Sequence, residues 1–302
     1  LEEENLWVDL YGLRFVRVMN GAGTLRTPKE AEELASYETV GAIMAGTYTV
    51  EERIGNKGNV YFYDEASGSS LNSNGMPNLG IKWCQENLPK MVKIARDVGK
   101  PFFVSVAGDS PNEYAELTKM AFAAGANGVE LNASCPNRWV GNKQGIIPCF
   151  DQNLLASILL AVREAVGRVA IVGVKLSPYS DPIFLKLIAN TLSQSGLVKF
   201  VTICNTFPNA FDMDENGNPL ITFGNGLAGL GGSDFRCIAL GQVLQFRNYL
   251  PKHIQIIGVG GISTGGDAKK FIKAGALMVQ IGTAFLRKGP NIFGDIIAGL
   301  VD

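Results

Sequence analysis

The chain has 302 residues, of which 46% are hydrophobic and 18% charged, and its formal net charge at pH 7 is −1. This balance supplies ample apolar material for a core and gives no electrostatic reason to expect nucleic acid or an anionic membrane as a partner. The longest apolar runs are the length of strands, too short to span a membrane.

Short apolar runs alternate with longer amphipathic stretches, which is the pattern of βα units in a parallel sheet. Strands are predicted at Val16–Asn20, Val40–Ala45, Phe102–Val106, Gly128–Asn132, Ala170–Leu176, Lys199–Cys204, Ile254–Gly258 and Leu277–Ile281. Helices are predicted at Pro28–Ser36, Gln85–Asp97, Asn112–Ala124, Asn153–Val166, Pro182–Gln194, Asp234–Asn248 and Ala268–Lys273. The pattern predicts an α/β protein, a single (β/α)8 TIM-barrel domain over residues 1–302. The less favoured alternative is an open doubly wound sheet, which needs fewer strands or a second domain.

Three further segments complete the predicted barrel. Leu6–Leu10 and Leu13–Phe15, on either side of Tyr11-Gly12, predict a hairpin that closes the bottom. Long insertions follow the second and sixth strands, at Gly46 to Met76 and Thr206 to Gly232. Loops after barrel strands build active sites and lids, so both are expected at the catalytic end, the second as a mobile cover.

Residues 130–137, Glu-Leu-Asn-Ala-Ser-Cys-Pro-Asn, are the most informative stretch. A buried strand ends at Asn132, and Cys135 follows in a tight turn at the edge where barrels place reacting groups. The one histidine, His253, is expected at the other end, so Cys135 and the lysines are the candidate proton carriers. Lys175 ends the fifth strand, where its ammonium can stabilise negative charge. The alternative is a structural cysteine buried in a turn.

Glycine motifs end the last two strands, at residues 257–262 and 280–284. Glycines let backbone N–H groups approach an anion, and the loops after these strands are the usual phosphate site of the fold. The motifs therefore predict a phosphate site, with tight turns as the alternative. A third glycine cluster, residues 228–232, either adds to this site or acts as a hinge.

Amide side chains gather at strand ends and in the loops expected at the catalytic end. They are Asn20, Asn72, Asn132, Asn137 and Asn205. Because amides both donate and accept hydrogen bonds, the set predicts a substrate with amide- or urea-like groups. Residues 70–80 can also be interpreted as a loop whose backbone N–H groups bind a carboxylate, with a plain Asn/Gly/Pro turn as the alternative.

Cysteine usage bears on metal sites and on the compartment. The five cysteines form no Cys-x-x-Cys pair, so no metal is expected. The odd number and an N-terminal segment without signal-peptide features predict a cytoplasmic protein.

Through these motifs the chain resembles the dihydroorotate dehydrogenases, in particular their soluble cytosolic class, nearly from end to end. The resemblance rests on residues 18–23, 72–80, 131–137, 174–179 and 204–206 and on the glycine motifs after the seventh and eighth strands. It implies FMN at the top of a barrel, usually in a homodimer, and oxidation of dihydroorotate to orotate in pyrimidine biosynthesis. Fumarate is the preferred electron acceptor, and a partner subunit that reduces NAD is the alternative.

The resemblance also assigns roles by position. Cys135 is implied as the base that takes the C5 proton while hydride leaves C6, and Lys175 as the cation that stabilises the reduced flavin. The substrate-binding residues implied are Asn72, Asn74, Gly75, Met76, Asn132, Asn137, Asn205 and Thr206. The FMN-binding residues implied are Ala22, Gly23, Asn132, Lys175, Gly231, Gly232, Gly260, Gly261, Gly282 and Thr283.

Two positions depart from the family pattern. The family has a lysine at the end of the second strand, where this chain has Gly46, and a Pro-Arg pair where this chain has Asn59-Val60. We therefore expect weak dihydroorotate binding, unless Arg53 or Lys57 supplies the charge, and better turnover in Gly46→Lys if the pocket has room. The alternatives are an FMN oxidoreductase for another pyrimidine-like ring, or a flavin-binding paralogue with little turnover. The near-neutral charge argues against a tRNA-dihydrouridine synthase.

Overall fold

Eight parallel strands form a nearly closed barrel in a computed structural model that describes residues 6–140 and 143–301. The strand order is β3-β16-β15-β12-β11-β8-β7-β4. The bounds are β3 Val18–Asn20, β4 Ile43–Tyr48, β7 Phe102–Val106, β8 Gly128–Asn132, β11 Val172–Leu176, β12 Val198–Ile203, β15 Gln255–Val259 and β16 Met278–Ile281. The predicted TIM barrel is confirmed. Residues 1–5, on which the absence of a signal peptide was judged, and residue 302 lie outside the described residues.

The seam between β3 and β4 is closed by a side chain. Asn20 donates to the carbonyl of Met44 at 2.7 Å and accepts from its N–H at 2.8 Å, in the manner of a backbone pair. A single parallel bridge, Met19 to Ala42, adds to this. Asn20 is fully buried, and its amide group is hydrogen-bonded to the backbone of Met44. Its prediction as an amide that binds the substrate is therefore wrong.

Helices cover the outside of the barrel. They are α1 Pro28–Ala35, α2 Gly80–Asp97, α3 Pro111–Ala123, α4 Gln152–Val166, α5 Pro182–Gln194, α6 Arg236–Tyr249, α7 Gly265–Lys273, α8 Thr283–Lys288 and α9 Asn291–Val301. Three begin at a proline that follows a capping side chain, Thr27, Ser110 or Asp181, because proline suits the first helical turn. None of the helices within the described ranges is long and apolar enough to cross a membrane.

Several predicted helix boundaries were wrong. Helix α2 starts at Gly80, five residues before the predicted Gln85, and runs through Pro89. The predicted helix from Asp234 begins as a 3-10 turn, Ser233–Phe235, before α6. The prediction also missed α8 and α9, although the Gly289-Pro290 break between them and the apolar spacing of residues 292–300 were available signals.

The barrel bottom is closed by an antiparallel hairpin, β1 Trp7–Leu10 and β2 Leu13–Val16. Its buried side chains pack on Phe103 and Phe200, whose rings meet edge to face at 6.0 Å inside the barrel. Val16 belongs to this hairpin, so the predicted first strand is split and β3 starts at Val18. The backbone of His253 lies at this end, where its carbonyl accepts a bond from Tyr11.

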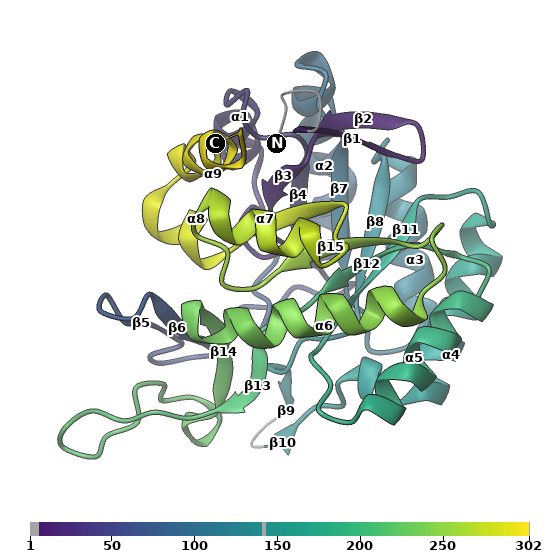
Figure 1. Cartoon of the computed structure of the whole chain (residues 1–302). Helices are drawn as coiled ribbons and strands as arrows, with labels where there is room; N and C mark the ends of the chain where they lie inside the picture. Colours follow the sequence, from purple (N-terminus) through teal and green to yellow (C-terminus); the bar gives the residue numbers. More distant parts are fainter. Residues whose placement is uncertain (1–5, 141–142, 302) are drawn as a thin grey trace.

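At the opposite end, the two insertions pair with each other (Figure 1). They form a four-stranded antiparallel sheet of order β13-β14-β6-β5, here called the upper sheet: β5 Tyr61–Tyr63, β6 Ser69–Asn72, β13 Phe207–Ala210 and β14 Ala228–Gly232. The glycine cluster at 228–232 is therefore a strand and not a hinge. A short ribbon, β9 Trp139–Val140 and β10 Lys143–Gln144, follows Cys135, and 3-10 turns lie at Pro148–Phe150 and Gly224–Gly226.

Candidate active site

A cavity of about 440 Å³ lies where the carboxyl ends of the barrel strands meet the upper sheet. Its volume falls in the range of small-molecule and cofactor sites. Asn20 does not line it, but the other site residues predicted from the sequence do, namely Ala22, Gly23, Asn72, Asn74, Gly75, Met76, Asn132, Cys135, Asn137, Lys175, Asn205, Thr206, Gly231, Gly232, Gly260, Gly261, Gly282 and Thr283. The structure thus brings them together, while their individual roles stay predictions.

Cys135 is almost completely buried, with 9% of its surface exposed. Burial raises the pKa of its thiol, because a thiolate loses hydration there. The backbone N–H of Asn137 and the charges of Arg53 and Lys175 oppose this rise in pKa. The thiol therefore lies in a dry site with cations near enough to stabilise its anion, as a cysteine that acts as a base requires.

The amides around Cys135 are held by one another and by nearby hydroxyls. Asn132 donates to Thr47 at 2.9 Å, and Asn137 donates to the side chain of Asn72 at 3.1 Å. Asn205 donates to the carbonyl of Ser134 at 3.1 Å. Because each side chain is held by neighbouring loops, the amides line the cavity in fixed orientations.

The segment from Ser73 to Met76 has the form of an anion-binding loop. Its carbonyls turn to the protein: Asn56 donates to Ser73 and Asn74, and Asn78 to Met76. Gly75 and Met76 both have positive φ, 74° and 56°. The N–H groups of residues 74–76 form no hydrogen bond to other described residues, so they are free to bind a carboxylate, as successive N–H groups in such turns do.

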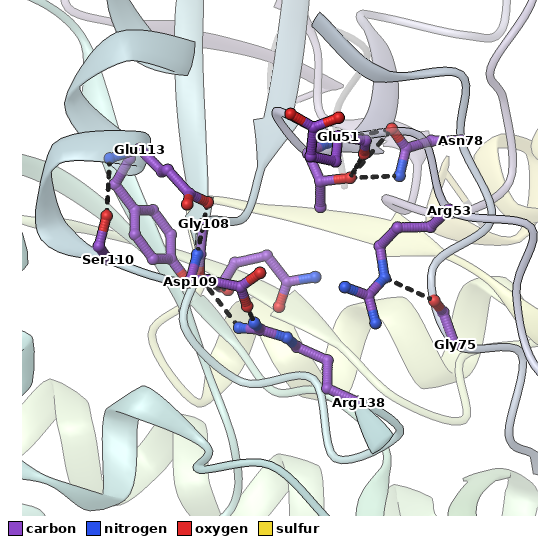
Figure 2. Close-up of polar contacts among 12 residues, drawn as sticks. Glu51, Arg53, Gly75, Asn78, Gly108, Asp109, Ser110, Glu113 and Arg138 are labelled. Atoms are coloured by element: carbon purple, nitrogen blue, oxygen red, sulfur yellow. Dashed lines mark hydrogen bonds and ion pairs between the residues drawn. The ribbon is translucent and has the colours of Figure 1, made fainter. Parts of the chain in front are cut away.

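Arg53 lies directly behind this loop. Its Nε donates to the carbonyl of Gly75 at 3.3 Å, and no carboxylate of the described residues forms a salt bridge with it. Figure 2 shows its guanidinium facing that of Arg138, which donates to Gly108 at 2.9 Å and pairs with Asp109. Burial and the charge of Arg53 lower the pKa of Arg138 to about 10. The two arginines fix the loops that flank Cys135 but do not line the cavity.

Two glycines of the cavity, Gly282 after β16 and Gly23 after β3, leave space that a ligand can fill. A Cβ at Gly282 or Gly23 would have no atom within 4 Å, so the backbone there is open to the cavity. Ser70 and Thr283 hydroxyls meet at 3.1 Å across the gap between upper sheet and barrel. Gln280 lines the floor, and its Oε1 is buried without a hydrogen-bond partner in the described chain. A ligand hydroxyl or imide N–H would satisfy this acceptor.

Gly46 has no room for a side chain. Its φ is +94°, and a Cβ would lie 2.5 Å from the carbonyl oxygen of Ser105. Strand β4 does not end at Ala45 as predicted but continues through Gly46 to Tyr48. The condition under which Gly46→Lys was expected to improve turnover, room for the side chain, is therefore not met.

Sequence reasoning missed several cavity residues. Among them are Arg26, Thr47, Tyr61, Gln280 and Lys288. Thr47 was not predicted because the strand was expected to end two residues earlier. Gln280 is the first residue of the predicted motif at 280–284 but was given no role, although it alternates into the barrel with Met278. Nothing local in the sequence marks Arg26 or Tyr61, which reach the cavity through the packing of loops.

Fold and site together define a barrel of the enzyme type in which a buried thiol, an ammonium and glycine loops share one cavity at the carboxyl ends of the strands. The sequence profile described as dihydroorotate dehydrogenase matches residues 5–302. The chain belongs to the dihydroorotate dehydrogenase family.

Individual relatives agree with this assignment. Dihydroorotate dehydrogenase A (fumarate) of Lactococcus lactis subsp. cremoris is 35% identical over 287 residues, covering 93% of this chain and 88% of the relative. The protein of the same name from Lactococcus lactis subsp. lactis is 34% identical over the same length. The crystal structure of a dihydroorotate dehydrogenase from Eimeria tenella in complex with ferulenol covers 99% of this chain and 84% of its own, with a TM-score of 0.81. At 20% identity that structure supports the fold alone.

Proposed function

We propose that this protein oxidises dihydroorotate to orotate, with FMN as its flavin. The observation that carries the proposal is the single cavity in which a buried thiol, four amides, an anion-binding loop and the glycine loops meet. The family is flavin-dependent, and these groups match the chemical features of dihydroorotate: a carboxylate, an imide and an acidic C5–H.

Each part of the cavity has a place in the reaction. The N–H groups of residues 74–76 bind the substrate carboxylate, while Asn72, Asn132, Asn137 and Asn205 hold the ring. Cys135, as the thiolate, takes the proton from C5 as the C5–C6 double bond forms. Burial excludes water from this proton transfer, and Lys175 and Arg53 stabilise the thiolate before it.

The residues present fit FMN. When bound, FMN supplies the two-electron acceptor for the hydride that leaves C6. The open backbone at Gly282, with Thr283 and the Gly260-Gly261 turn, would hold its phosphate, and the unpartnered Oε1 of Gln280 provides an acceptor for its polar groups. Lys175, 6% exposed and paired with no carboxylate of the described part, would face the developing negative charge.

The acceptor, the location and the assembly are part of the same proposal. Fumarate is the proposed acceptor because both Lactococcus lactis relatives carry it in their names. A cytoplasmic homodimer is proposed from the family resemblance.

A spectrum of the purified protein tests the proposal. We expect a yellow protein with about one FMN per chain, whose flavin absorbance bleaches when dihydroorotate is added without oxygen and returns with fumarate. A colourless protein that takes up no FMN on reconstitution would contradict the flavin assignment. A yellow protein that dihydroorotate does not bleach would contradict the substrate.

A second candidate is a flavin oxidoreductase that acts on a different pyrimidine-like ring. The glycine at position 46, in place of the family's lysine, favours it. Anaerobic bleaching by dihydrouracil but not by dihydroorotate would select this candidate.

A further inference from the structure

The cations around the cavity are unevenly distributed. Among the described residues that line it, those with a cationic side chain are Arg26, Lys175 and Lys288. Lys175 is on β11, and Lys288 ends α8, which follows β16 next to β3, so neither is on β4 or on the loop that follows β3. The two basic residues expected to replace the missing lysine do not line the cavity, since Arg53 lies behind Gly75 and Lys57 is exposed.

Arg26 reaches the cavity from the loop that pairs with Gly46. Gly46 donates to the carbonyl of Leu25 at 2.9 Å and accepts from the N–H of Gly23 at 2.6 Å. Residues 23–26 therefore lie along the part of β4 where the family's lysine would be attached. Through these backbone bonds the loop packs against the strand at Gly46 and brings a guanidinium to the same wall.

The guanidinium of Arg26 forms no salt bridge with the carboxylates of the described residues. Its Nε is buried without a hydrogen-bond partner in the described ranges. The nearby carboxylate of Glu30 is occupied by the cap of α1, where it accepts from the N–H groups of Arg26 and Thr27 at 2.7 and 2.8 Å. Burial lowers the pKa of Arg26, an electrostatic cost that a bound anion would offset. A buried arginine donor without a partner points to a ligand with an anionic group.

We propose that Arg26 binds the carboxylate of the substrate and replaces the charge that Gly46 removes from β4. This inference rests on the proposed oxidation of dihydroorotate and adds a specificity residue to it. Arg26 then binds the carboxylate together with the N–H groups of residues 74–76. The guanidinium supplies a positive charge, and the N–H groups fix the orientation of the carboxylate. The cavity would thereby keep its preference for an anionic pyrimidine although the lysine is absent.

The test compares orotate with its neutral carboxamide, each titrated against the flavin absorbance of the FMN-loaded protein. Arg26→Gln should weaken orotate binding on the order of 10- to 100-fold, as expected for loss of a charge-assisted hydrogen bond. Binding of the carboxamide should change little. Arg26→Lys should retain part of the preference, because it keeps the charge but loses the planar fork. Lys29→Gln, an exposed cation three residues away, is the matched control and should match the parent.

Other outcomes overturn the inference. If Arg26→Gln weakens the binding of orotate and of the carboxamide equally, Arg26 supports the shape of the cavity and does not bind the carboxylate. If the binding of both ligands is unchanged, Arg26 has no role in binding. If Arg26→Gln does not fold, Arg26→Lys is the second variant, and equal weakening of orotate and carboxamide binding in it would also overturn the inference. Failure of the parental protein to bind FMN or orotate contradicts the proposed function itself, so the two failures are distinguishable.

Discussion

At the scale of single residues, Cys135 shows how burial and charge act against each other. Burial raises the pKa of its thiol, while Arg53 and Lys175 lower it. The net direction is upward, so the base form grows with increasing pH. We therefore expect flavin reduction by dihydroorotate to rise with pH through a pKa above the ordinary thiol value of about 8.5.

Removing this thiol gives the first prediction. Cys135→Ala should keep its flavin but reduce it about 10²- to 10⁴-fold more slowly, the usual contribution of a positioned base. Cys135→Ser should keep some rate with a pH optimum moved upward, because a hydroxyl is less acidic than a thiol. Stopped-flow absorbance under anaerobic conditions measures both, with the exposed Cys237→Ala as control. A parental rate in Cys135→Ala would place the base elsewhere.

The charge behind the thiol gives the second prediction. Arg53→Gln removes a positive charge that favours the thiolate, so the pKa of Cys135 should rise and the rate–pH profile should move to higher pH. Glutamine keeps an N–H donor for the carbonyl of Gly75. The measurement is the single-turnover rate across pH, with Lys57→Gln as a control on the same loop. An unshifted profile would show that Arg53 acts through structure alone.

At the scale of elements, β4 explains why the family's lysine is absent. The backbone at Gly46 has a φ of +94°, which non-glycine residues rarely adopt, and the space beyond its Cα is filled by the Ser105 carbonyl. The strand itself takes a path that excludes a side chain, and the neighbouring loop at residues 23–26 fills the wall.

Substitution at Gly46 gives the third prediction. Gly46→Lys should not improve turnover and should destabilise the fold, by roughly 1–3 kcal/mol for the backbone strain and more for the overlap with Ser105. Urea denaturation measures the loss. Gly99→Ala, at a φ of +72° with no atom within 4 Å of the added Cβ, isolates the strain from the overlap. A stable Gly46→Lys protein that binds orotate more tightly would contradict this account of β4.

At the scale of the whole molecule, the barrel depends on two facing rings in its interior. A Cβ at Gly173 would lie 2.1 Å from the ring of Phe200, so this glycine on β11 makes the space that the ring occupies. Phe200 in turn contacts Phe103, and both pack under the hairpin that closes the bottom. The strands that carry the cavity at their carboxyl ends are therefore packed around these two rings at their lower halves.

The fourth prediction tests this packing. Gly173→Ala should lower the free energy of unfolding by about 1–3 kcal/mol, because the ring must move, and Phe200→Leu in the same chain should recover part of the loss. Gly241→Ala, in helix α6 with no atom within 4 Å of the added Cβ, should be neutral or slightly stabilising. A single denaturation transition is expected if residues 1–302 form one domain, which stays a prediction. A Gly173→Ala protein as stable as the parent would contradict the close contact.

Local sequence determined much of this protein. The strands of the barrel are apolar runs that end at polar residues, and the turn that carries Cys135 follows such a run directly. These features depend on residues a few positions apart, so periodicity and turn chemistry predict them. The same holds for the glycine loops and for Lys175, because parallel strands place their carboxyl ends at one edge.

Tertiary structure decided the rest, because it depends on contacts between distant segments. The upper sheet forms when insertions more than a hundred residues apart pair, as β6 does with β14. Asn20 looked like a substrate amide, but its place beside Met44 uses it to close the barrel. Arg26 carries no motif and reaches the cavity because the backbone of its loop pairs with β4 at Gly46. Pairing and close packing across the barrel cannot be inferred from neighbours in the chain, and they select which polar groups face the ligand.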